Sequence, residues 1–125
     1  MQIVTSQLSD DQFLEIINFI HQFFDENKKK EAVVFYGWEC NTEYLYEDIH
    51  IRSSEIKSFI AASREKSIYI LGKSDLYIGD TNGEFEFRLC HESDVHFESK
   101  DAKLLDSVKK RWMGEYGVHE KLQGR

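Results

Sequence analysis

The sequence predicts an α+β fold in which three helices pack on a mostly antiparallel sheet of about five or six strands. Three observations lead to this prediction. Asn82-Gly83 lies between two runs of alternating apolar and polar residues, which is a strong signal for a β-hairpin. Segments near both ends of the chain have the 3.6-residue apolar period of helices. The predicted strands follow one another in a run, an order typical of the α+β class.

The Asn82-Gly83 dipeptide also predicts the register of its hairpin. Both residues tolerate the positive φ that a two-residue type I′ turn requires. Counting outward places Ile78 opposite Phe87 on one face of the sheet and Tyr77 opposite Arg88 on the other. A slip of one residue would turn every side chain to the wrong face, so we expect this register to be tightly held.

The first half of the chain predicts two helices and two strands. Ser9 and Gln12 form a capping box that begins a helix, which should end near residues 25–27. Residues 32–38 are β-branched and aromatic and predict a strand, and residues 44–51 predict a second one beside it. Ser53 or Ser54 should cap a short helix that ends near residues 64–66.

The second half predicts a meander of strands and a final helix. Strands are expected at residues 68–71, 76–79, 84–90 and 95–97, and the last of these should leave an open sheet edge. Ser99 should cap the C-terminal helix. Residues 1–125 are expected to form one domain, since a single core is typical at this length, with a flexible tail at residues 118–125.

Composition and charge exclude several classes of function. Acidic residues outnumber Lys and Arg by 23 to 16, which gives a net charge of −7 and disfavours nucleic-acid binding. No apolar run approaches the roughly 18 residues of a membrane helix. The N-terminal residues lack the pattern of a secretion signal. The two cysteines are therefore expected to be free thiols in the cytoplasm.

The segment after the first predicted strand is the main candidate for a binding surface. Large aromatic side chains are enriched at interface hot spots, and acidic rims steer basic partners. In the competing interpretation, Trp38 and one or two tyrosines belong to the core and the carboxylates only keep the sheet soluble. The candidate residues are Tyr36, Trp38, Glu39, Glu43, Tyr44, Tyr46, Glu47 and Asp48.

Arg88, Cys90 and His96 form an alternative ligand or thiol site. Adjacent strand residues point to opposite faces, so His91 is expected to lie away from Cys90. His96 is the better partner, because it should lie across the hairpin. No oxyanion site or orienting group is identifiable for a catalytic cysteine.

We expect no metal and no cofactor. The possible ligands contain no closely spaced pair of the kind that identifies a zinc site. They are Cys40, His50, Cys90, His91 and His96.

These observations favour a non-catalytic binding module that engages a basic protein partner, with the chain as a monomer or a homodimer. Small acidic proteins of this type include inhibitors, such as the immunity proteins that neutralise bacterial toxins. This is an analogy of size and charge, and fold or composition does not imply function. The alternative is a small enzyme or ligand-binding domain that uses Arg88, Cys90 and His96.

Overall fold

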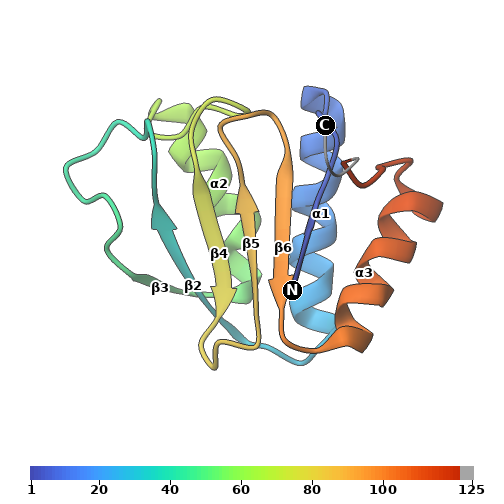
Figure 1. Ribbon diagram of the computed structural model, residues 1–125. Coiled ribbons are helices and arrows are strands. Elements are labelled where there is room, and N and C mark those ends of the chain that lie inside the picture. The colour runs from blue at the N-terminus through green and yellow to red at the C-terminus, as the bar shows by residue number, and fades with distance from the viewer. Residues whose placement is uncertain (122–125) are drawn as a thin grey trace.

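The computed structural model describes residues 1–121 and has the predicted α+β architecture, with one six-stranded antiparallel sheet and three helices (Figure 1). The strands lie in the order β1-β6-β5-β4-β2-β3. A 3₁₀ turn, Ser53–Glu55, precedes α2. The elements are β1 (Gln2–Val4), α1 (Asp10–Glu26), β2 (Glu31–Tyr36), β3 (Ile49–Arg52), α2 (Ile56–Glu65), β4 (Leu76–Asp80), β5 (Phe85–Leu89), β6 (Val95–Ser99) and α3 (Ala102–Glu115).

The predicted register of the β4–β5 hairpin is confirmed. Ile78 pairs with Phe87, and Tyr77 pairs with Arg88. The connection spans residues 81–84 and is wider than the predicted type I′ turn, because Gly83 has a positive φ of 71° whereas Asn82 does not. The side chain of Asp80 accepts hydrogen bonds from the amides at 84 and 85 and so closes this wider connection.

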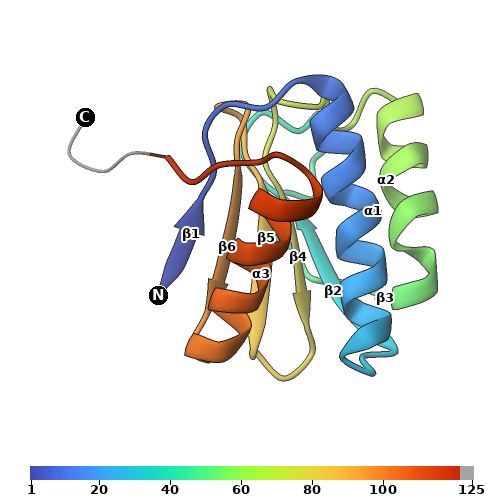
Figure 2. The same ribbon diagram turned by 90° about the vertical axis from the view of Figure 1, so that its right-hand side faces the viewer.

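All three helices cover the same face of the sheet (Figure 2). The predicted Ser9–Gln12 capping box begins α1, and the buried face of that helix supplies aromatic rings to the core. Phe23 packs edge-on against Phe87 of β5, with ring centroids 5.5 Å apart. Trp112 of α3 closes the other side of this cluster. Among residues 1–121, no helix lies on the opposite face of the sheet.

Two predicted strands are wrong or too long. The second strand begins at Ile49, so residues 44–48 belong to the preceding loop. Residues 68–71 form turns because the amides of Ile68 and Tyr69 both donate to the carbonyl of Ser63 at the end of α2. Tyr69 is buried there, so its apolar character reflects packing against the core instead of strand pairing.

The predicted open edge at β6 is also wrong, because β1 pairs with it: Ile3 lies opposite Phe97. Only three residues form β1, too few to show an alternating pattern. The following tail is packed for part of its length, since Val118 is buried and the amide of Lys121 donates to the carbonyl of Val4. The structure therefore packs residues 118–121 against the rest of the fold, and residues 122–125 lie outside the described part of the chain.

The predicted caps of the later helices differ from the observed ones. Ser53 lies within the 3₁₀ turn, and neither Ser53 nor Ser54 caps α2. Asp101 is the N-cap of α3, where its carboxylate accepts from the amides of Lys103 and Leu104. Ser99 does not cap α3 directly. Its hydroxyl accepts a hydrogen bond from the backbone amide of Asp101, the residue that does.

Candidate functional site

The acidic–aromatic loop, residues 37–48, joins β2 to β3 and projects beyond the β3 edge of the sheet (Figure 1). Trp38, Tyr44 and Tyr46 are 54%, 56% and 59% exposed, and Leu45 is exposed beside them. These four residues are half of the large exposed apolar side chains in the described part of the chain. Three of the predicted aromatic residues therefore face solvent, which contradicts the interpretation of Trp38 as a core residue.

Tyr36 is not part of this surface, and its predicted role in partner binding is wrong. It is the last residue of β2 and points into the core, where its ring stacks on Phe59. Its hydroxyl lies 2.6 Å from the Ser63 hydroxyl. The strand ends only after Tyr36, and its alternation places this side chain on the covered face.

Hydrogen bonds hold the loop at several points along its length. Three are backbone bonds, from Asp75 N to Trp38 O, from Asn41 N to Ile68 O and from Tyr46 N to Tyr36 O. In addition, the buried thiol of Cys40 donates to the carbonyl oxygen of Asp75, which fixes the first bend. None of these bonds uses an exposed side chain of the loop, so those side chains are free to contact a partner.

The carboxylates of the loop are exposed, and the loop contains no Lys or Arg. None of them forms an ion pair with another residue in the range 1–121. The loop therefore presents uncompensated negative charge next to apolar rings. These carboxylates belong to Glu39, Glu43, Glu47 and Asp48.

The aromatic surface continues from the loop onto the uncovered face of the sheet. The ring of Tyr46 lies 6.2 Å from that of Phe35, which stacks on Tyr77 at 4.3 Å. The guanidinium of Arg88 lies over the Tyr77 ring, 5.5 Å from its centroid. This row runs across β2, β4 and β5, where the strand register places Phe35, Tyr77 and Arg88 side by side.

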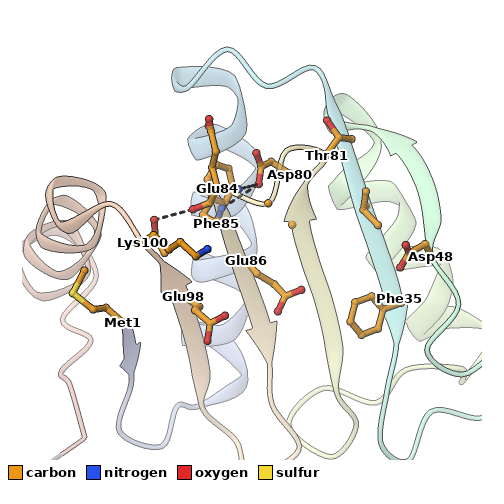
Figure 3. Close-up of a pocket in the computed structure, with 14 residues that line it drawn as sticks. Met1, Phe35, Asp48, Asp80, Thr81, Glu84, Phe85, Glu86, Glu98 and Lys100 are labelled. Carbon is orange, nitrogen blue, oxygen red and sulfur yellow. Dashed lines mark hydrogen bonds between the residues drawn. The ribbon is translucent and has the colours of Figure 1, made fainter.

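A hollow of about 500 Å³ lies beside this row on the uncovered face (Figure 3). Phe35 and Asp48 line it from the loop side, whereas Glu86 and Glu98 line it from β5 and β6 (Figure 3). Gly79 leaves space between them, because it has no side chain on the intervening strand. The hollow thus combines an apolar wall with carboxylates and adjoins the acidic–aromatic loop.

Glu86 and Glu98 are neighbours across β5 and β6. Burial is the main cause that raises the pKa of Glu86, and the negative charge of Glu98 raises it further. Like charges directly opposite one another on a sheet are unfavourable. A cation placed in the hollow would relieve this repulsion.

A second group of polar side chains surrounds Cys90 at the opposite end of β5. The buried carboxylate of Asp75 accepts from Arg88 at 3.1 Å and from the backbone amide of His91 at 2.7 Å. It also lies 2.8 Å from Nδ1 of His91. The ring of Trp38 lies 6.0 Å from the His91 ring, so this group adjoins the acidic–aromatic loop.

The expectation that His91 points away from Cys90 is wrong. Strand β5 ends at Leu89, so His91 lies in a turn where strict alternation no longer applies. Its Nδ1 is 3.9 Å from the Cys90 sulfur. His96 lies opposite Arg88, as predicted, and its Nε2 is 3.1 Å from Oδ1 of Asp94.

The Cys90 thiol is fully buried, and this burial raises its pKa to about 12. Cys40 behaves in the same way, with its pKa raised by burial to about 11. Both cysteines are free thiols, as predicted. At neutral pH they are therefore protonated, whereas a nucleophilic cysteine needs a thiolate.

Asp75 and Asp94 are the members of the Cys90 group that sequence reasoning missed. Each is a buried carboxylate next to a strand. Asp75 immediately precedes β4, and Asp94 immediately precedes β6. Acidic residues beside predicted strands are ordinary turn residues, so only their burial distinguishes these two.

No protein-family model matches this chain, and no curated protein or solved structure is significantly similar to it. Within residues 1–121, none of the helices has the length and apolar character needed to cross a membrane.

Proposed function

We propose that this protein is a non-catalytic binding module that engages a basic protein partner through the acidic–aromatic loop and the adjoining hollow. The observation that carries the proposal is the exposure of Trp38, Tyr44 and Tyr46 among carboxylates that form no ion pair within residues 1–121. Monomeric proteins rarely leave such apolar groups together at the surface without an interaction to make. An inhibitor of the immunity type is one form that such a module takes.

The two components of this surface have different roles. Exposed carboxylates attract a basic partner over several ångströms and so raise the association rate, an effect that salt screens. Aromatic side chains stabilise the final complex through buried area and slow dissociation. The ordered backbone of the loop supports the second role, because little conformational entropy is then lost on binding.

Charge reversal tests the proposal. The loop variant carries Glu43→Lys, Glu47→Lys and Asp48→Lys, and each substitution reverses an exposed carboxylate. The control variant carries Glu15→Lys, Glu65→Lys and Asp106→Lys, which are exposed positions on the three helices. Both variants change the net charge from −7 to −1, so only the location of the reversed charges differs.

Both variants and the native protein are used for capture from a lysate of the native host at low and high salt. We expect one basic protein to be retained in stoichiometric amount by the native chain and the control variant at low salt. The loop variant should lose it, and purified components should show slower association with a weaker salt dependence. Equal capture by the two variants, or no capture by the native chain at either salt, would contradict the proposal.

The alternative function is chemistry at Arg88, Cys90 and His96. It is favoured by one observation, which is that several polar side chains come close together around Cys90. Cys90 is nevertheless buried and its pKa is raised, which is the opposite of an activated nucleophile. We expect Cys90 to react with iodoacetamide slowly in the native chain and rapidly in urea. Fast native labelling of Cys90, with Cys40 still protected, would support thiol chemistry instead.

A further inference from the structure

The turn between β5 and β6 gathers three different metal-binding groups on one side. The amide of Cys90 donates to the carbonyl of Asp94 at 2.9 Å, which extends the ladder beyond the Arg88–His96 pair. The side chains of Cys90, Asp94 and His96 therefore project from the same face. One ligand atom from each lies within 4.8 Å of the other two.

The types of these groups match the chemistry of zinc. Zn²⁺ binds thiolate sulfur, imidazole nitrogen and carboxylate oxygen in tetrahedral sites. Metal–ligand distances of 2.0–2.3 Å place neighbouring ligand atoms about 3.4–3.6 Å apart in a tetrahedron. The Asp94 oxygen and the His96 nitrogen are 3.1 Å apart, so this pair needs a movement of only about 0.3–0.5 Å.

We propose that Cys90, Asp94 and His96 bind a zinc ion, with a water molecule as the fourth ligand. The three protein ligands come from one tight hairpin, so its backbone pairing positions them before the metal arrives. His91 lies on the other side of Cys90, where its Nδ1 is 2.8 Å from the Asp75 carboxylate.

The exposure of the three residues allows an ion to enter. The His96 side chain is partly exposed, whereas Cys90 and Asp94 are buried. A hydrated ion can therefore meet the imidazole first and the thiol afterwards. Cys40 offers a matched contrast, because it is buried to a similar degree but its thiol donates to a backbone carbonyl.

Cobalt(II) is the probe for this site, because a bound thiolate gives it a charge-transfer absorption that oxygen and nitrogen ligands do not. The full chain is titrated under reducing conditions with Co²⁺ and then with Zn²⁺. We expect one equivalent of Co²⁺ to produce the thiolate band and one equivalent of Zn²⁺ to abolish it. Zn²⁺ should also raise the thermal midpoint, since it binds only the folded chain.

Matched variants assign the ligands. Cys90→Ser should remove the band, whereas Cys40→Ser and His50→Ala should retain it. His96→Gln serves as a second variant in case Cys90→Ser fails to fold, because His96 is partly exposed. It should weaken Zn²⁺ binding by more than the roughly 10–100-fold that loss of an outer-shell contact causes.

Two results would overturn the proposal. The first is the absence of a thiolate band in the native chain, or a band that survives Cys90→Ser, which would identify Cys90 as a buried structural thiol. The second is a band that is lost with His91→Ala or Asp75→Asn but unaffected by His96→Gln. That result would place the ion on the Asp75 side of Cys90 and reject the ligands assigned here. Neither result depends on the proposed function of the loop.

Discussion

The two faces of the sheet differ in what their side chains do, and strand β5 shows the difference most clearly. Phe87 points toward the helices and is surrounded by aromatic rings from α1, β6 and α3. Arg88, the next residue, points away from them and forms polar contacts with Asp75 and Tyr77. One face therefore supplies most of the buried apolar area, and the other presents the groups that can bind a ligand or partner.

The largest expected effect lies on the covered face. Phe87→Ala should lower the free energy of unfolding by about 3–5 kcal/mol, because it leaves a cavity among rings that cannot collapse freely. Urea unfolding followed by circular dichroism measures the change. Tyr77→Ala, on the uncovered face of the adjacent strand, is the comparison and should cost clearly less. Equal losses for the two variants would mean that the faces do not differ in energy.

The next effect concerns the polar contacts that join the uncovered face to the loop. Asp75→Asn should lower the free energy of unfolding by about 1–3 kcal/mol, because a buried charged acceptor loses its strongest bonds. The same urea experiment measures it. Asp48→Asn is the control, since that exposed carboxylate should change stability by less than about 0.5 kcal/mol. If Asp75→Asn left the free energy of unfolding unchanged, these contacts would contribute little to stability.

The loop should affect binding much more than stability. Trp38→Ala removes a ring that is 54% exposed, so the free energy of unfolding should change by less than about 0.5 kcal/mol. If the ring is an interface anchor, dissociation from the partner should accelerate by roughly 30-fold, which corresponds to 2 kcal/mol. Surface plasmon resonance measures this rate. Ile70→Ala, which removes another exposed apolar side chain, should leave it unchanged.

The smallest effect is a gain in stability in the hollow. The raised pKa of Glu86 means that folding disfavours its charged form, so this group destabilises the fold at pH values above its unfolded pKa. Glu86→Gln should therefore increase the free energy of unfolding at pH 7, by no more than about 0.5 kcal/mol for a half-exposed group. The gain should disappear below about pH 4, where the carboxyl is protonated in both states. A gain that persists at low pH would have another cause.

Local patterns predicted the parts of the fold that depend on local chemistry. The Ser9–Gln12 capping box and the register of Ile78 with Phe87 follow from contacts between residues close in sequence. Residues 68–71 were wrongly predicted as a strand, because an apolar run of that length packs equally well as a turn against a core. Strand β1 was missed, because its three residues become a strand only by pairing with β6, more than ninety positions away.

The candidate sites differ in the same way. The aromatic and acidic residues of 37–48 are contiguous, so the sequence identified the loop, and the structure removed only Tyr36 from it. The Cys90 group combines residues from a turn, two strands and the segment before β4. From the sequence, Arg88, Cys90 and His96 were named as a site, whereas Asp75 and Asp94 were missed. A rule for strand alternation also wrongly separated Cys90 from His91.

The sequence by itself determined the α+β class, the first helix and the hairpin register, because periodicity, capping and turn chemistry act over a few residues. Only the tertiary structure decided which side chains are exposed in the acidic–aromatic loop and which polar groups meet around Cys90. Burial and convergence depend on chain segments far apart in sequence. Asp75 and Asp94 show this most directly, because two ordinary turn residues become buried partners of histidines only after the sheet has formed.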